Sequence, residues 1–396
     1  MTVNALLSFE SILKSVGGIL LAIVILLAMI TIHEFGHYIF GKLLNFKINE
    51  FSIGFGPALY KKRSKKTGEL FAVRLIPLGG YCAFDGEDEG ELEEMDEQKS
   101  DEPFQDFKQK EITQPLEKTD EKEEEYPEPQ GIRFNDQAPW KRIIVLIAGA
   151  TMNYLLALAL IILMFACIGQ PLYKIQAPRE DRTMNAAFEV GDIIESIDGE
   201  SVYQITDYMD AIDGKKKGDI VTITVLRGGN LVDLEVTLNA DADIKNMSDI
   251  QTLLVALDID SMKTVTVKHA FFETIGKSFV YSWKIGGTVL RSLGELLTGK
   301  LGMDAVGGPV TTITVTAEAA SNGMLSFLNI AALIGVNLAV FNLLPVPALD
   351  GCKVIFCLIE WIRKKPVNRN VEAMIHFIGI ITLFGFAILV DLLHLF

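Results

Sequence analysis

The chain has 396 residues, enough for two or three domains, and 49% of them are hydrophobic although 22% are charged. Its net charge of −15 arises within residues 85–136, where 21 acidic and 6 basic residues lie. The rest of the chain is balanced and offers no basic surface for nucleic acid. The four cysteines form no CxxC pair, which argues against a disulfide framework or a cysteine zinc site.

Four apolar stretches are long enough to cross a bilayer, which takes about 20 residues. They predict transmembrane helices over residues 17–44, 140–168, 324–351 and 371–396. Buried core helices of a soluble protein are the alternative, but such helices normally keep a polar stripe. The first stretch has neither a basic leader nor a small-residue cleavage site after it. We therefore expect it to stay in the mature protein and not to be removed as a signal peptide.

Basic residues lie on one side of these spans if every span crosses once. They follow the first and third spans and precede the second, and that side is expected to be cytoplasmic, with both termini on the other side. The residues are Lys42, Lys47, Lys61, Lys62, Arg63, Lys65, Lys66, Lys141, Arg142, Lys353, Arg363, Lys364 and Lys365.

Two different segments separate the first span from the second. Within residues 45–84, the stretches 51–56 and 70–76 are strand-like and are joined by a basic, glycine-containing turn, which predicts a β-hairpin. Residues 85–136 are acidic, contain scattered prolines and have few aromatic side chains. That composition is typical of a flexible insertion without a core of its own.

Residues 171–240, between the second and third spans, predict a small α+β domain. The sequence GDIIESIDG at 191–199 predicts a short strand that ends in an Asp-Gly turn, and Thr206 is placed to cap a short helix. Two alternating strands follow within residues 221–238. An unrelated β-hairpin module is the alternative, but GDIIESIDGESV resembles the core signature of PDZ domains.

The segment 269–300, which follows this domain, is amphipathic. Aromatic residues such as Phe272 and Trp283 alternate in it with Lys277 and Lys284. This pattern predicts a helix that either lies along the outer membrane surface or covers the substrate entrance, and the interrupting charges argue against a fifth span.

Two of the five histidines lie in the sequence HEFGH, residues 33–37. On a helix, positions i and i+4 share a face, so His33 and His37 could bind one Zn²⁺ with Glu34 beside the water that it activates. Ionisable groups at the end of a transmembrane helix are costly and indicate function. An interfacial polar turn is the alternative interpretation.

A catalytic zinc ion usually has three protein ligands, so one more is required. We interpret His269, His376 and His394 as packing or interfacial residues. The best candidate is Asp350, because two prolines before it break the helix and let irregular backbone turn a carboxylate inward. A role as an interfacial helix cap stays open at this point.

Together these features resemble the intramembrane site-2 zinc metalloproteases, in particular bacterial members with a PDZ domain, of the regulator of sigma-E protease type. The resemblance covers nearly the whole chain. It rests on HEFGH, on NLLPVPALDG at residues 342–351 and on the PDZ-like domain between the second and third spans. It implies that His33, His37 and Asp350 bind Zn²⁺ and that Glu34 is the catalytic residue.

The resemblance also implies substrate-positioning residues. Asn153, which ends the sequence GATMN, and Asn342 match the family's asparagines, although a helix–helix hydrogen bond is an equal alternative for Asn153. The hairpin with Gly54, Phe55 and Gly56 looks like the family's membrane-associated hairpin beside the active site. Its edge would hold an unwound substrate by main-chain hydrogen bonds.

The implied fold is a polytopic α-helical membrane protein with four transmembrane helices, a membrane-associated β-hairpin and an extracytoplasmic PDZ-like domain. The implied function is that of a zinc-dependent intramembrane endopeptidase in the bacterial cell membrane, with its active site toward the cytoplasm. The expected partners are lipid, single-span membrane substrates such as an anti-sigma factor or remnant signal peptides, and a peptide ligand of the PDZ-like domain.

Two other functions are alternatives for a chain with these features. A membrane zincin with a cytoplasmic active site would need a further ligand in a soluble domain, whereas the chain offers only the acidic stretch there. A non-catalytic scaffold that displays a PDZ domain would not need Glu34 as a general base.

Overall fold

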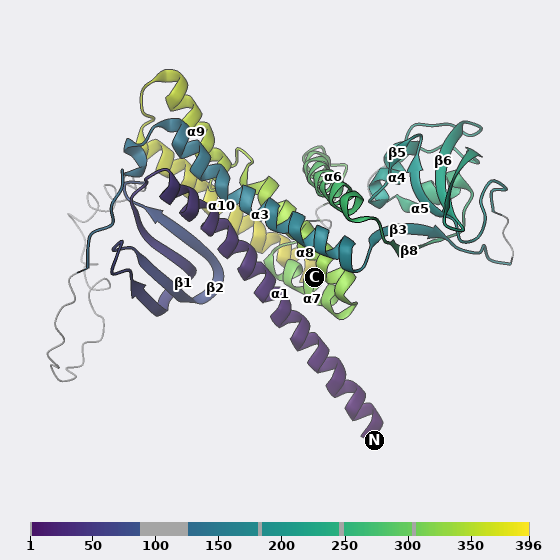
Figure 1. Ribbon diagram of the computed structural model, residues 1–396, viewed down its shortest axis with the longest axis horizontal. Helices are drawn as coiled ribbons and strands as arrows, with labels where there is room; N and C mark the ends of the chain where they lie inside the picture. The colour runs from purple at the N-terminus through teal and green to yellow at the C-terminus, as the bar shows by residue number, and fades with distance from the viewer. Residues whose placement is uncertain (1, 88–125, 181–183, 245–248, 303–305, 396) are drawn as a thin grey trace. The chain divides into compact units, whose positions relative to one another are not determined.

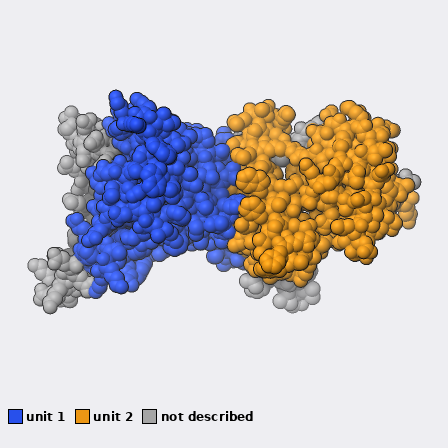
Figure 2. Space-filling view, turned by 45° about the horizontal axis from the view of Figure 1, so that its top comes forward, with its two compact units in different colours: residues 1–156, 308–317, 338–396 blue, residues 157–307, 318–337 orange. Residues whose placement is uncertain are grey.

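The computed structural model describes residues 2–87, 126–180, 184–244, 249–302 and 306–395. Most of the acidic insertion therefore lies outside the described residues. The chain divides into two compact units, shown in Figure 2. Unit 1 comprises Met1–Leu156, Gly308–Ala317 and Leu338–Phe396, and unit 2 comprises Ala157–Gly307 and Glu318–Asn337.

Four helices of the described chain are long and apolar enough to cross a membrane, which confirms the predicted fold class. They are α1 (Thr2–Leu43), α3 (Pro139–Cys167), α8 (Met324–Asn342) and α10 (Arg369–Leu395) (Figure 1).

The third predicted span, 324–351, is shorter in the structure than expected. Helix α8 ends at Asn342 because Pro345 and Pro347 cannot continue it, and a turn leads into a new helix, α9 (Asp350–Arg363). A further helix that the sequence did not predict, α7 (Pro309–Ser321), precedes α8. Asp350 therefore begins a helix and does not end one.

The predicted hairpin consists of β1 (Ile48–Arg63) and β2 (Leu70–Phe84), both longer than the sequence suggested. Both strands bend. Residues 48–53 of β1 pair with 80–84 on one side and with 70–73 on the other, whereas residues 58–63 pair with 70–74. The hairpin thus folds back into a small sheet of four segments, with 80–84 at one edge.

Helix α1 holds this sheet directly (Figure 1). The Tyr38 hydroxyl donates a hydrogen bond to buried Glu69 at 3.0 Å, and Lys42 forms an ion pair with the same carboxylate at 2.5 Å. Phe46, Phe84 and Phe134 pack as a triangle with ring centroids 5.5–5.6 Å apart. Phe134 belongs to the short helix η2 (Phe134–Asp136), which leads into α3.

Unit 2 contains the predicted α+β domain. Its antiparallel sheet has the order β7-β6-β4-β3-β8, and β5 pairs with β4. The strands are β3 (Gln170–Ile175), β4 (Ile193–Ile197), β5 (Glu200–Ser201), β6 (Ile220–Arg227), β7 (Asn230–Thr237) and β8 (Met262–Val267), and the helices are α4 (Ile205–Ile212) and α5 (Ile250–Leu257).

The predicted boundary of this domain, 171–240, is too short. Strand β8 pairs with β3 over its whole length, and Leu253 and Leu257 of α5 are fully buried in the domain core. We therefore call residues 170–267 the β domain. The short helix α4 is capped by Gln204, one of two partners in a capping box with Asp207, and not by Thr206 as predicted.

The amphipathic segment forms the helix α6 (Phe271–Leu297). One face of α6 binds the β domain through residues seven positions apart: Lys277 pairs with Glu195 at 3.1 Å and Lys284 with Asp207 at 3.1 Å. Arg291 pairs with Asp210. We call these three pairs the basic ladder.

Candidate metal centre

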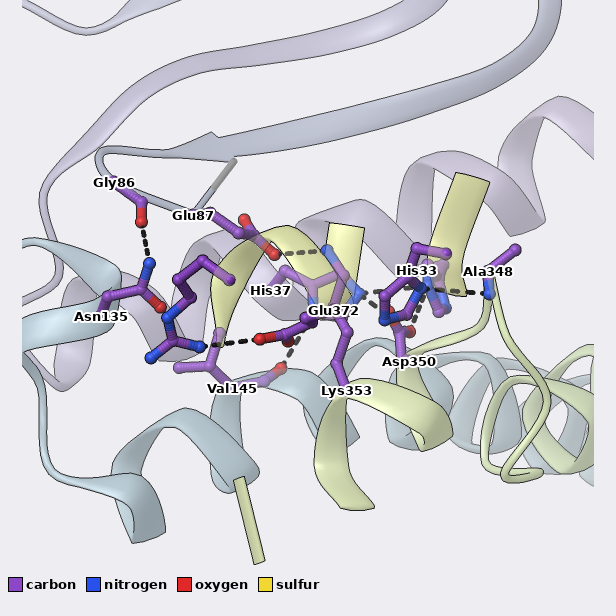
Figure 3. Close-up of polar contacts among 12 residues, drawn as sticks. His33, His37, Gly86, Glu87, Asn135, Val145, Ala348, Asp350, Lys353 and Glu372 are labelled. Atoms are coloured by element: carbon purple, nitrogen blue, oxygen red, sulfur yellow. Dashed lines mark hydrogen bonds and ion pairs between the residues drawn. The ribbon is translucent and has the colours of Figure 1, made fainter. Parts of the chain in front are cut away.

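His33 and His37 of α1 meet Asp350, the first residue of α9, at one point in unit 1 (Figure 3). The two Nε2 atoms lie 3.1 Å apart. Oδ2 of Asp350 lies 3.1 Å from Nε2 of His33 and 3.4 Å from Nε2 of His37. Among the described residues, this is the one group of three or more His, Cys, Asp or Glu whose ligand atoms lie within 4.8 Å of one another.

The neighbours of each imidazole turn its Nε2 toward that point. Nδ1 of His37 donates a hydrogen bond to the carbonyl of Val145 in α3, at 2.9 Å, so its Nε2 is left to bind a metal. The side-chain amides of Asn342 and Asn153 lie 3.3 and 3.5 Å from Nδ1 of His33.

The buried amide of Asn153 fits a protonated Nδ1 on His33. Its Oδ1 atom has no hydrogen-bond partner among the described residues. Turning the amide by half a rotation would place that oxygen where the Nδ1 proton of a metal-bound imidazole needs an acceptor. Both asparagine side chains therefore lie next to Nδ1 of His33, on the side of the ring away from Nε2.

Glycine backbone allows α3 to approach the histidines. A Cβ atom at Gly149 would lie 2.4 Å from Nε2 of His37 and 2.7 Å from Cε1 of His33. A Cβ atom at Gly36 would lie 2.5 Å from the carbonyl oxygen of Ala148. The two helices thus touch through their glycines, and a side chain at residue 149 would occupy the metal position.

The Asp350 carboxyl lies in an electrostatic environment that suits a metal ligand. Its Oδ2 atom faces Nε2 of both imidazoles, and the side chain is only 20% exposed. Two neutral imidazoles with one carboxylate form a donor set that zinc binds in catalytic sites.

Glu34 lies beside the edge of the small sheet. A Cβ atom at Gly80 would lie 3.1 Å from Cγ of Glu34, so the backbone of the edge segment 80–84 passes against this side chain. Glu34 is adjacent to His33 in the chain, and its carboxylate is close enough to both histidines to interact with them electrostatically.

The predicted residues Gly54, Phe55 and Gly56 lie at the bend of β1. Both glycines have positive φ, 87° and 82°, which explains the residue type. Phe55 is 44% exposed, and its ring stacks on Tyr81 with a centroid distance of 6.4 Å. The described contacts of this bend lie within the hairpin itself.

Sequence reasoning missed three residues around the centre: Val145, Gly149 as a contact of the imidazoles, and His376. Val145 acts through its main-chain carbonyl, which no residue type announces. His376 was interpreted as packing, although a buried imidazole within an apolar span is itself a signal of function.

Relatives from several bacteria match most of the chain, among them the following three. The regulator of sigma-W protease RasP of Bacillus subtilis is 26% identical to it and covers 92% of this chain and 95% of its own length. Zinc metalloprotease RasP of Bacillus licheniformis is 26% identical, and the match covers 89% of this chain and 92% of that relative. Zinc metalloprotease RasP of Geobacillus kaustophilus is 26% identical, and the match covers 92% of this chain and 94% of that relative.

A solved structure matches part of the chain. It is the PDZ domain of an SdrC-like protein from Listeria monocytogenes, 28% identical, covering 17% of this chain and 72% of that domain, with a TM-score of 0.15.

The model of peptidase family M50 matches residues 21–386, which includes both parts of the metal centre. The matched relatives are named zinc metalloproteases, so the predicted cofactor, Zn²⁺, agrees with them. The predicted activity, that of an intramembrane zinc metalloprotease, is thereby confirmed: the chain belongs to peptidase family M50.

Proposed function

We propose that His33, His37 and Asp350 bind the catalytic Zn²⁺ and that Glu34 is the general base in hydrolysis of a peptide bond in or near a transmembrane segment. The observation that carries this proposal is the convergence of three ligand atoms within 4.8 Å from helices that begin and end far apart in the chain. Zinc, when bound, polarises the scissile carbonyl and activates water.

The protein's own residues supply the rest of the chemistry. Val145 and the amides of Asn153 and Asn342 orient the imidazoles, so that both Nε2 atoms face the carboxylate. Glu34 removes a proton from the attacking water and passes it to the leaving amine. Direct contact of the two asparagines with substrate, which the family resemblance implied, stays a prediction.

The edge segment 80–84 is the proposed substrate platform. A transmembrane helix hides its carbonyls in its own hydrogen bonds, so the substrate unwinds before it is cut. The free edge of the sheet passes Glu34 at Gly80 and offers main-chain donors and acceptors to an extended chain. The bend at Gly54, Phe55 and Gly56 borders the same sheet and would guide the side chains of the substrate.

Single-span membrane proteins are the proposed substrate class. One relative is named a regulator of sigma-W protease, so a membrane-bound anti-sigma factor is the first substrate to test, followed by remnant signal peptides. The protein lies in the bacterial cell membrane with both termini and the β domain outside, and its metal centre lies toward the cytoplasm.

The helix α6 is proposed to lie in the outer membrane interface. Its basic side chains Lys277, Lys284 and Arg291 are held by the β domain, whereas large apolar side chains elsewhere on α6 have no such cover. Phe272 is 85% exposed, Trp283 72% and Leu297 80%. Aromatic side chains of this kind favour the boundary between headgroups and acyl chains.

The β domain is proposed to act as a gate for substrates with bulky outer domains. Its strand β8, which ends the described sheet and pairs only with β3, is also proposed to accept an extended peptide as an added strand. Deleting residues 170–267 should preserve cleavage of a short, pretrimmed substrate and should allow cleavage of an untrimmed one. If the zinc-loaded deletion protein fails to cut the short substrate, the domain delivers substrates and is no gate.

Metal analysis and cleavage of a single-span substrate by the purified full-length protein test the catalytic proposal. Glu34→Gln should retain zinc and lose about 10²–10⁴-fold in rate, since it removes the base and leaves the ligands. Asp350→Ala should lose both zinc and activity, and Cys352→Ala, two residues further on, should change neither. Substantial proteolysis by Glu34→Gln, or normal zinc content in Asp350→Ala, would refute the assigned roles.

Orientation has a separate test. In a variant without native cysteines, a cysteine at exposed Ser201 should react with an impermeant reagent in intact cells. A cysteine at exposed Lys62 should react only after the membrane is permeabilised. Labelling of Lys62→Cys in intact cells would invert the proposed topology.

A further inference from the structure

We infer that His376 and Gly379 of α10 are positioning residues for the third metal ligand. They hold the turn of residues 343–349 that joins α8 to Asp350, and through it they set the place of the carboxylate. The inference rests on the proposed function, because it assumes that Asp350 binds zinc. From the sequence, His376 was expected only to be a packing or interfacial residue.

The turn has little regular structure of its own. Its main-chain hydrogen bonds are short-range, such as Val346 to Leu344 at 2.7 Å and Leu349 to Val346 at 3.1 Å. Ala348 has a φ of 80°, a conformation that a residue with a Cβ atom rarely adopts. Such a conformation is strained and persists only where the surroundings determine it.

His376 supplies one of these determining contacts. The main-chain N–H of Ala348 donates a hydrogen bond to Nδ1 of His376 at 3.1 Å (Figure 3 shows the bond at Ala348). The imidazole is only 7% exposed, and its ring meets that of Phe356 of α9 at a centroid distance of 5.9 Å. The same side chain therefore contacts the strained residue of the turn and the helix that Asp350 begins.

Gly379 supplies the second contact, from the same face of α10. A Cβ atom at Gly379 would lie 2.4 Å from Cβ of Pro347 and 2.5 Å from its carbonyl carbon. Residues i and i+3 of a helix are neighbours on its surface. His376 thus accepts a hydrogen bond from Ala348, and Gly379 packs closely against the adjacent Pro347.

The turn transmits this placement to Asp350. A Cβ atom at Gly351 would lie 2.3 Å from the carbonyl oxygen of Leu344, so the first turn of α9 rests directly on the turn. The turn and α10 also line a common cavity of about 270 Å³, whose walls include Ala348, Lys353 and His376.

Groups that orient metal ligands typically contribute 10–100-fold to metal affinity or activity. We therefore expect His376→Ala to weaken zinc binding by about 10–100-fold in the full-length protein, measured by competition with a chelator of known affinity. His376→Asn should restore most of the loss, because Oδ1 of asparagine can accept the hydrogen bond that Nδ1 accepts. The visible spectrum of the Co²⁺-substituted protein should change in His376→Ala and return in His376→Asn.

Gly379→Ala has a matched control on the same helix. A Cβ atom at Gly385 meets nothing within 4 Å, so Gly385→Ala should bind zinc as the wild type does, whereas Gly379→Ala should bind it about 10-fold or more weakly. If Gly379→Ala does not fold, the pair His376→Ala and His376→Asn decides the question.

Asp350→Ala separates this inference from the proposed function. If Asp350→Ala loses zinc while His376→Ala and Gly379→Ala bind it with wild-type affinity, the positioning role is wrong and the ligand set stands. If Asp350→Ala itself keeps wild-type affinity, the proposed ligand set is wrong. A loss in His376→Ala that His376→Asn fails to restore would also overturn the role of the hydrogen bond.

Discussion

The metal centre and the β domain of this protease are held together by different kinds of contact. At the centre, helix backbones touch: a Cβ atom at Gly149 would lie 2.4 Å from Nε2 of His37. In the β domain, a buried apolar core of sheet and helix residues stabilises the fold, and charged side chains form ion pairs around it. The centre is intolerant of added atoms, whereas the domain is sensitive to lost partners.

This difference follows from what surrounds each region. In an apolar membrane there is little hydrophobic gain from bringing helices together, so close packing through small residues and internal polar contacts hold them. The β domain is a conventional layered fold in which burial of apolar area drives assembly. Substitutions that distinguish added atoms from lost partners should therefore act unequally on the two regions.

Gly149→Ala should have the largest effect. The new methyl group would collide with both imidazoles, so we expect zinc affinity and proteolysis to fall by at least about 100-fold. Gly276→Ala in α6 is the control, because a Cβ atom there meets nothing within 4 Å. Metal analysis and substrate cleavage measure both. Wild-type zinc binding by Gly149→Ala would show that α1 and α3 can move apart to accept a methyl group. The proposed difference between the metal centre and the β domain would then be wrong.

Asp192→Asn should test the sensitivity of the β domain to a lost partner. Asp192 is 1% exposed and accepts two hydrogen bonds from Arg227, at 2.8 and 2.7 Å. Because Arg227 is 26% exposed, water can solvate its charge in part, so losing the buried carboxylate should cost about 1–3 kcal/mol, which protease susceptibility under denaturant should report. Glu189→Gln, which loses an ion pair of 2.8 Å to the same Arg227 at a side chain 67% exposed, should cost less than about 1 kcal/mol. Zinc content should stay unchanged in both.

The same carboxylate predicts a pH dependence. Burial raises the pKa of Asp192, but its hydrogen bonds from Arg227 and from the Glu189 main chain lower it more, so the net pKa lies below the ordinary value. Its contribution to stability is therefore complete above the unfolded-state pKa of about 3.9 and is lost as the pH falls toward the folded-state pKa. Unfolding of the β domain should become easier between about pH 5 and pH 3, and less so in Asp192→Asn.

The basic ladder should give the smallest effect. Lys277→Ala breaks a pair of partly exposed side chains and should destabilise the packing of α6 on the β domain by about 0.2–1 kcal/mol. Hydrogen exchange in α6 measures the change. Exchanging the charges, with Lys277→Glu and Glu195→Lys together, should restore most of it. If Lys277→Ala lost more than about 3 kcal/mol of stability, the pair would behave like a buried ion pair. The expected order of effects in the two regions would then be wrong.

Sequence reasoning succeeded where the pattern was local. HEFGH spaces two imidazoles on one helical face, and the four apolar spans are visible from composition alone. It identified Asp350 as a candidate but placed it at the end of a span, because nothing local reveals that α9 starts there.

The missed features depend on contacts between distant residues. Strand β8 belongs to the β domain because it pairs with β3, a partner about 90 positions earlier in the chain, and no turn signal marks that pairing. The contacts of Gly149 with His37 and of His376 with Ala348 are equally non-local. The sequence shows that Gly149 lies in a helix and that His376 lies in an apolar span, but it does not show which residue each one contacts.

Because the chain is made from its N-terminus, the metal centre can be completed only late in synthesis. Asn342, which faces His33, follows it by 309 residues, and Asp350 comes later still. At about 5–20 residues per second, a ribosome needs roughly 15–60 s after His33 before either residue exists. During that interval the chain already contains α1, α3 and the β domain but lacks Asp350, the third ligand of the proposed zinc site. If the proposed ligand set is correct, a chain that stops early stays inactive, and proteolysis begins only in molecules whose synthesis is nearly complete.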